Sequence, residues 1–358
     1  RLWLGCAGAG GLDGVVRHGA ASDRPGPPRH AVPAMLLRQL TDLASTSGAG
    51  ASGIDGRLDL SLGGLIIGGQ TLIGAHVVVE QTAGKPHIAL MEGELPGQSL
   101  VRFERDQAAG GGLISGALAF SSRDPERLHG WFHGIARTVT AAAALKATAT
   151  LSSVPGGIGI DRIEIERGLT HLSGTGSYLL AAPGLRPAPR LALRLASPRL
   201  TITDIPAYAV GPDAREEKPD LDFEIDLEAA RLVHEGRETG RLVARARRDG
   251  AMTSIERIAI SELDGASLIA SGTLGGGARR LTVKLDAERL GGIAAIAEQV
   301  FPGALTASLR ARAAQLQPAL VVVTLANEEA DASFVLNADG RLAATAMTLD
   351  GRIGMRGD

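Results

Sequence analysis

Apolar and polar residues alternate in many short segments from residue 56 onward. In the segment Leu58–Leu62, for example, Leu58, Leu60 and Leu62 are separated by Asp59 and Ser61. Successive side chains of a β-strand point to opposite faces of the sheet, so each such segment has one apolar and one polar face. The pattern predicts antiparallel strands with one face in water.

Turn signals such as AGKP, LPGQ, LDGA and NADG recur at short intervals between these segments, which favours meandering hairpins. Helical spacing of apolar residues occurs in three places instead, namely residues 33–44, 124–137 and 286–300. The last two segments begin with Asp124 and Asp286, which we predict to be N-cap residues.

Short matching segments indicate an internal repeat. DPERLHG (124–130) matches DAERLGG (286–292), and LPGQSL (95–100) matches LDGASL (263–268). After the two predicted helices, LKATATL (145–151) is paired with LTASLRA (305–311). The shared order predicts tandem β-meander units in an elongated arrangement.

The domain organisation follows from this repeat. Residues 1–32 are rich in Gly, Pro and Arg and are predicted to be coil, and residues 33–55 to be a helix and linker. The first repeat unit is predicted over 56–210 and the second, truncated, over 220–358, with the polar segment 211–219 as linker. Because the chain begins with Arg1, we expect it to be a piece of a longer protein.

The number of predicted strands restricts the architecture. The alternation gives about 16 to 18 strands, whereas open sheets rarely exceed about 10 strands without curling or splitting. The fold class is therefore mainly β with a few short helices, and two architectures fit. The strands either form sandwiches or form an elongated, curled sheet, a trough whose floor is lined by aliphatic side chains.

Composition and charge exclude several function classes. Lys and Arg number 37 against 39 Asp and Glu, which argues against a nucleic-acid partner bound by a general positive field. Cys6 is the single cysteine, so the chain forms no internal disulfide and no cysteine-rich metal cluster. No apolar run of 18 residues and no signal peptide are present.

Catalytic and metal-binding motifs are absent from the sequence. His129 and His133 have the i, i+4 spacing of zinc ligands, but helix packing is the simpler interpretation because no third ligand is evident. The acids Asp222, Glu224, Asp226 and Glu228 alternate along one strand, which indicates a solvated face rather than a calcium or catalytic site. We therefore predict no catalytic residue, no metal and no cofactor.

The order of the segments resembles the AsmA-like family of diderm bacteria. In the first half the resemblance rests on LDLSL (58–62), GGQTL (68–72), ELPGQSLVRFE (94–104), GALAFSSRDPERLHGWF (116–132), LSGTGSYLL (172–180) and RPAPRLALRLASPRLTI (186–202). In the second half it rests on LDFEIDLEAARLVHEG (221–236), ELDGASLIASGTL (262–274) and DAERLGG (286–292).

This resemblance implies a function. AsmA-like proteins are anchored in the inner membrane by one N-terminal helix, extend through the periplasm as β-troughs and are linked to phospholipid passage and outer-membrane biogenesis. We therefore expect a non-enzymatic periplasmic trough that handles phospholipid or another acyl-chain lipid and reaches both membranes through segments outside this chain. The groove would be lined by Leu58, Leu60, Leu62, Leu191, Leu193, Leu195, Phe223, Ile225, Leu227, Leu281, Val283 and Leu285.

Two other function classes compete with this interpretation. The β-repeats could be a scaffold for outer-membrane protein biogenesis that holds no lipid. A β-rich carbohydrate-active enzyme would need paired carboxylates and aromatic sugar platforms, which aromatic residues at 3% of the chain do not favour.

Overall fold

The fold was analysed in a computed structural model of the chain. It describes residues 55–67, 70–106, 112–133, 143–182, 184–205, 221–275, 279–300, 303–327 and 333–354. Of the residues that the structure describes, 68% lie in strands and 12% in helices, and the strand pairing is predominantly antiparallel. These features confirm the mainly β fold class with few short helices.

The chain divides into two compact units, Arg1–Lys146 and Ala147–Asp358, which are described separately below. This division does not coincide with the predicted repeat boundary at residues 211–219, which lie outside the described residues. The coil predicted over 1–32 and the helix predicted over 33–44 also lie outside them.

Unit 1 contains an antiparallel meander in which each strand pairs with the next along the chain. Its elements are β1 (Gly56–Ile67), β2 (Gln70–Thr82), β3 (Lys85–Leu95), β4 (Ser99–Arg105), β5 (Gly116–Ser122) and α2 (Pro125–His133).

Helix α2 packs against the sheet of unit 1 through its apolar side chains. Leu128 and Trp131 form a buried cluster with Leu72, and Leu95 and Phe120 pack around it. The helix begins as predicted, because Asp124 Oδ1 accepts a hydrogen bond of 3.0 Å from the backbone N–H of Arg127. The described helix ends at His133.

Unit 2 contains most of the strands. The sheet strands are β6 (Leu145–Val154), which begins at the boundary, β7 (Gly157–Arg167), β8 (Thr170–Leu179), β9 (Arg190–Ser197), β11 (Asp222–Ala229), β14 (Arg241–Asp249), β15 (Met252–Leu263), β16 (Ala266–Leu274), β17 (Arg279–Ala287), β18 (Ala319–Asn327), β19 (Ser333–Leu342) and β20 (Thr345–Gly354). A small second sheet contains β10 (Leu200–Thr201), β12 (Leu232–His234) and β13 (Arg237–Glu238). The helical elements are η2 (Ile202–Asp204), α3 (Gly291–Val300), α4 (Ala304–Arg312) and η3 (Ala313–Gln315).

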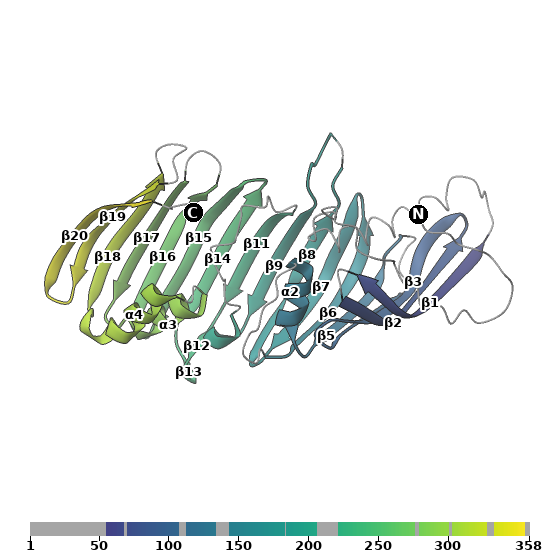
Figure 1. Ribbon diagram of the computed structural model, residues 1–358, viewed down its shortest axis with the longest axis horizontal. Coiled ribbons are helices and arrows are strands. Elements are labelled where there is room, and N and C mark those ends of the chain that lie inside the picture. The colour runs from purple at the N-terminus through teal and green to yellow at the C-terminus, as the bar shows by residue number, and fades with distance from the viewer. Residues whose placement is uncertain are drawn as a thin grey trace, which may run out of the picture. The chain divides into compact units, whose positions relative to one another are not determined.

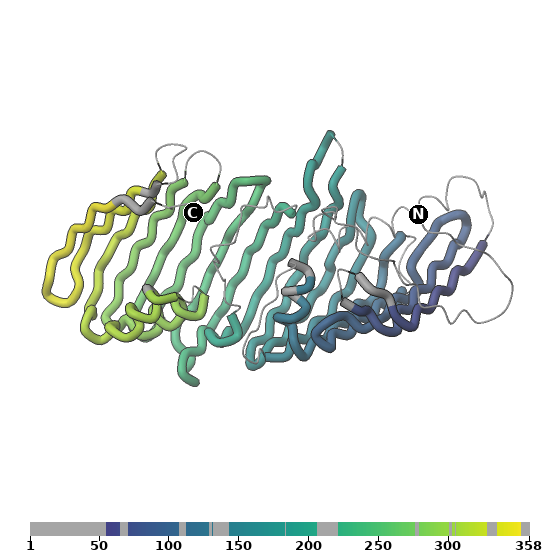
Figure 2. The backbone as a smooth tube through the Cα atoms, in the orientation of Figure 1, coloured from purple at the N-terminus to yellow at the C-terminus, as the bar shows by residue number. Residues whose placement is uncertain are grey.

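From β7 to β20 the strands of the large sheet lie side by side in chain order (Figure 2). All described pairings among them are antiparallel except one, because β9 and β11 pair in parallel. The prediction of antiparallel meanders is therefore wrong at this junction. The connection between the two strands is long and includes β10 and η2, so it can return the chain to the same end of the sheet, as a parallel pair requires.

A cap of two helices covers the ends of several neighbouring strands on one side of this sheet. In Figure 1, α3 and α4 lie against the ends of β14 to β18. Buried side chains from those strand ends and from α3 and η2 form the main core of unit 2. Its most buried members, each at most 1% exposed, are Ala229, Leu232, Leu263, Ala266, Ala287 and Ala294. We call this region the cap core.

The predicted helix at 286–300 begins later than expected. Asp286 is not an N-cap residue, because it lies in β17 and is paired with Ser267 and Leu320 on the two neighbouring strands. The strand alternation continues to Ala287, which the cap core buries. Helix α3 begins at Gly291, where Gly292 allows close packing on Leu263.

The repeat alignment is wrong for LTASLRA (305–311). Its predicted counterpart LKATATL lies in strand β6, but LTASLRA itself forms most of helix α4. Leu309 and Leu316 pack against the cap core, and Ala313 is part of it. Residues spaced four and three apart share one helix face, and Ala, Leu and Arg favour helices, so this segment folds as the second helix of the cap.

Two hairpin turns share a left-handed glycine and a hydrogen bond to its carbonyl. Gly97 follows β3 and Gly265 follows β15, with φ values of +81° and +82°. The carbonyl of Gly97 accepts a hydrogen bond of 3.0 Å from Asp124 N, and that of Gly265 accepts one of 3.0 Å from Glu288 N. In both units the turn therefore fixes the segment that enters the following helix.

We predict that Gly97→Ala destabilises unit 1 more than Gly265→Ala destabilises unit 2. Left-handed backbone costs an alanine about 1 kcal/mol at either turn. A Cβ at residue 97 would also lie 2.3 Å from the Asp124 carbonyl oxygen, whereas at residue 265 the nearest atom, in the Glu288 side chain, is 3.5 Å away. Hydrogen exchange within each unit should show losses of about 2–3 and about 1 kcal/mol, respectively. Equal losses would contradict the assigned close contact.

Candidate functional site

Interstrand register decides which predicted groove residues share a face. Leu191, Leu193 and Leu195 of β9 are directly opposite Phe223, Ile225 and Leu227 of β11, so these six side chains lie on one face. Leu281, Val283 and Leu285 of β17 are opposite Gly272, Ala270 and Leu268 of β16. The pairings through β14 and β15 place all nine predicted residues of unit 2 on the same face.

Two complete rows of apolar residues or glycines cross this face from β7 to β20. Every position in both rows is directly opposite the next on the neighbouring strand. We call the two rows the apolar floor. One row is Ile163, Gly174, Leu195, Leu227, Ala244, Ile258, Ala270, Val283, Val323, Ala338 and Leu349. The other is Ile160, Gly176, Leu193, Ile225, Ala246, Ile255, Gly272, Leu281, Leu325, Leu336 and Gly351.

The apolar floor is only partly covered. Leu193, Ile225, Leu281 and Leu325 are half-buried, and Leu349 is 48% exposed. Within the floor Ala270 and Ala338 are buried, and in the next row toward the cap burial extends to Ala229, Leu242, Ile260 and Val321. Among the described residues of unit 2 no second large sheet packs on this face. The described strands of unit 2 therefore do not form a sandwich.

The opposite face of unit 2 is polar and rich in ion pairs. Glu224 and Arg190 are 2.6 Å apart, Asp226 and Arg245 are 3.2 Å apart, and Glu228 and Arg241 are 3.5 Å apart. Asp222 accepts a hydrogen bond of 2.6 Å from the backbone of Gly250. The acids of β11 thus form a partly exposed charged surface, as their alternation predicts, and pair with arginines of both neighbouring strands.

Three predicted groove residues lie in unit 1. Leu58, Leu60 and Leu62 of β1 are directly opposite Val79, Val77 and Ala75 of β2. Leu58 and Leu60 are 54% and 44% exposed. They belong to an apolar face of unit 1.

The sequence prediction missed part of the floor. On β7, Ile158 and Ile160 alternate normally, but Ile163 and Ile165 follow after an irregular step in register between Ile160 and Ile163. The three-residue gap interrupts the alternation in the sequence while keeping the side chains on the same face. The signal that could have revealed this strand is isoleucine on both sides of that gap.

Two ionisable side chains have shifted pKa values. Partial burial raises the pKa of Tyr178, which is opposite Leu191 on the apolar face. In unit 1, hydrogen bonding to Asp59 raises the pKa of His76 above 6.5, with a smaller contribution from Glu92. His76 Nε2 lies 2.9 Å from Asp59 Oδ1, and its Nδ1 lies 3.5 Å from Glu92 Oε1.

Metal and membrane sites were also sought within the described residues. No group of three or more His, Cys, Asp or Glu there could hold a metal ion. The side chains of His129 and His133 are not among those described. None of the described helices has the length and apolar character needed to span a membrane.

Comparison with known proteins gives no relative: no protein-family model matches the chain, and no curated protein or solved structure matches it significantly.

We predict that Asp59→Asn lowers the pKa of His76 more than Glu92→Gln does, because the hydrogen bond to Asp59 has the larger effect. The pair stabilises unit 1 below the usual histidine pKa of about 6.5, while Asp59 remains ionised, and this stabilisation is lost as the pH rises through the raised pKa of His76. NMR titration of the imidazole measures the shift. Asp350→Asn, in unit 2, is the control. An unchanged titration in Asp59→Asn would contradict the pairing.

Proposed function

We propose that the apolar floor of unit 2 binds the acyl chains of phospholipid and lets them move along the sheet. The observation that carries the proposal is the pair of uninterrupted apolar rows, which cross every strand of the large sheet from β7 to β20 without a charged side chain. Apolar surface of this extent, left half-exposed, is typical of a site for an apolar ligand.

The size of the floor suits several acyl chains. About ten interstrand spacings of roughly 4.8 Å make it about 50 Å long. A bilayer's hydrocarbon core is about 30 Å thick, so one leaflet's chains extend about 15 Å. Each buried methylene contributes about 0.8 kcal/mol to binding without directional contacts. A chain held in this way is stable but can slide, because no polar group fixes its position.

The proposal extends to the cellular role through the resemblance to AsmA-like proteins. The open sheet with an apolar face supports the trough architecture that the resemblance implies, and with it the transfer of phospholipid between inner and outer membrane. In this role the protein is non-enzymatic and periplasmic and is anchored through a segment outside this chain. No step of chemistry is required of any side chain.

The decisive experiment compares charges on the two faces of the sheet. Ile225→Asp places a carboxylate in the middle of the floor, beside Leu193 and Ala246. An unpaired charge in apolar surroundings costs about 2 kcal/mol or more, so phospholipid bound from vesicles should fall more than tenfold. Leu193→Asp should have the same effect. Native mass spectrometry of the protein after incubation with vesicles measures the bound lipid.

The matched control is Ile269→Asp on β16. Ile269 is 45% exposed and is paired with Lys284 and Ala259 on the opposite face, so the change should leave lipid binding intact. Circular dichroism establishes that all variants are folded. A folded wild-type chain that binds no phospholipid, or equal binding by Ile225→Asp and Ile269→Asp, would favour the scaffold alternative over the lipid site.

A further inference from the structure

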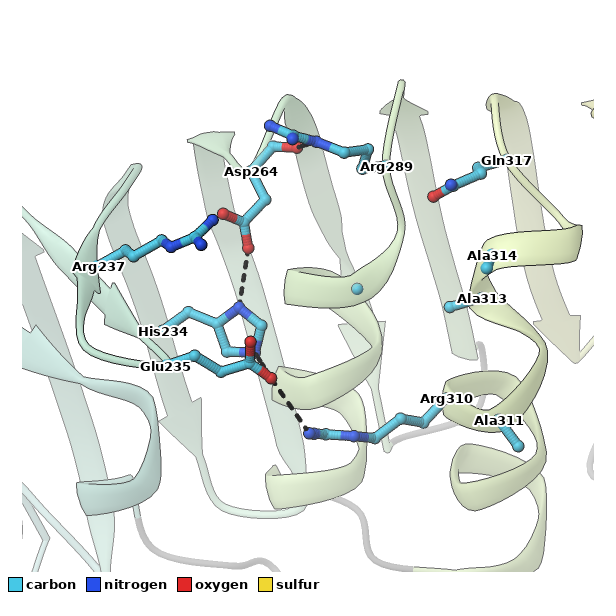
Figure 3. A pocket seen from close by; sticks show the side chains of 11 residues that line it. His234, Glu235, Arg237, Asp264, Arg289, Arg310, Ala311, Ala313, Ala314 and Gln317 are labelled. Atoms are coloured by element: carbon cyan, nitrogen blue, oxygen red, sulfur yellow. Dashed lines mark hydrogen bonds and ion pairs between the residues drawn. The ribbon is translucent and has the colours of Figure 1, made fainter.

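A polar pocket lies beside the cap core, away from the residues of the apolar floor. Its volume is about 390 Å³, within the range of small-molecule sites. Figure 3 shows its side chains coming from the β12–β13 hairpin, the turn between β15 and β16, the segment before α3, the end of α4, and η3 with the segment after it. No floor residue lines it, so it is a separate candidate site within unit 2.

The imidazole of His234 is oriented by a carboxylate. Its Nδ1 lies 2.8 Å from Asp264 Oδ2, and an ionised carboxylate only accepts hydrogen bonds, so Nδ1 carries the hydrogen. The side chain is 13% exposed. Its Nε2 is buried and has no hydrogen-bond partner among the described residues; the carboxylate of Glu235 lies 3.8 Å away. A buried polar atom without a partner calls for an explanation, and a ligand group supplies one.

Two arginines of the pocket have no carboxylate partner in the part of the chain that the structure describes. Among the described residues, neither Arg237 nor Arg289 lies within ion-pair distance of an acid. Arg289 Nε donates a 2.9 Å hydrogen bond to the Asp264 carbonyl, which fixes the side chain and leaves its two terminal nitrogens available. Arg310, by contrast, is paired with Glu298 at 3.4 Å and with Glu235 at 3.9 Å.

The remaining wall of the pocket also suits an anion. Gln317 Oε1 accepts a 3.3 Å hydrogen bond from Leu290 N, which leaves the amide NH₂ as a donor. Gly291, which lines the pocket, is the first residue of α3, so the positive end of the helix dipole is at the pocket wall. Ala313 and Ala314 add only small apolar groups and leave room.

From these contacts we infer that the pocket formed by His234, Arg237, Asp264, Arg289 and Gln317 binds a phosphate monoester group. Planar guanidinium groups match phosphate oxygens bidentately, and two unpaired ones match a doubly charged group. Bound phosphate would lie against His234 Nε2 and supply the hydrogen-bond partner that this buried atom lacks among the described residues. The source of the group is either a soluble phosphate ester or the headgroup of a phosphatidic-acid-like lipid.

Calorimetric titration with inorganic phosphate and with glycerol phosphate tests the soluble source, and binding to vesicles that contain phosphatidic acid tests the lipid source. Binding should fall at least tenfold in Arg289→Gln and in Arg237→Gln. Arg257→Gln removes an exposed arginine of β15 outside the pocket and should change nothing. Ile225→Asp should also leave phosphate binding intact, which separates this site from the apolar floor.

NMR signals of the His234 ring provide a readout that does not depend on the variants, since phosphate in the pocket must shift the Nε2 resonance. Loss of binding in both arginine variants, in either the soluble or the vesicle arm, supports the site and identifies its source. If Arg289→Gln destabilises α3, the phosphate affinity of the Arg237→Gln variant and the NMR signals of His234 still test the inference. No binding in either arm, or binding that neither arginine affects, overturns the inference.

Discussion

Interstrand register is the constraint on which the surface chemistry of unit 2 depends. Side chains alternate between faces along each strand, so a slip of one residue at any pairing would move a strand's apolar residues to the polar face. The ladder from β7 to β20 contains steps where the register shifts, and each keeps the faces consistent. The result is one face where apolar residues and glycines of eleven strands meet, and another where arginines and acids meet.

The cap buries the apolar face at only one end of its strands. Helix α3, η2 and the small sheet bury the strand ends around Leu232, Leu263 and Ala287 and form the main core. The floor row next to these strand ends packs partly against this core through Leu227, Ala244, Ile258 and Val323, whereas the row beyond it stays half-exposed. A large sheet ordinarily hides such a surface under helices or a second sheet. Here the buried cap core stabilises the sheet while the floor remains accessible, which is the combination a lipid-binding surface requires.

The apolar floor and the polar pocket are chemically opposite surfaces of the same unit. The floor has no directional contacts, which suits a ligand that moves. The pocket has oriented donors, with His234 held by Asp264 and Arg289 held by the carbonyl of the same residue. Asp264 has a left-handed backbone, φ +53°, in the turn that also contains Gly265. This turn therefore connects the sheet, the start of α3 and the pocket.

Much of the fold and part of the site followed from the sequence alone. The alternation determined the strands, their polar and apolar faces and the mainly β class, because a period of two is a local property of the chain. The N-cap at Asp124 was equally local. By contrast, contacts between distant segments decide three other features. These are the parallel pair β9–β11, the continuation of β17 through Asp286 and the helix α4. Such contacts also form the polar pocket, whose residues lie between positions 234 and 317. Only the tertiary structure could align nine of the twelve predicted residues on one face, since register is set by contacts between strands and is not encoded in any one strand.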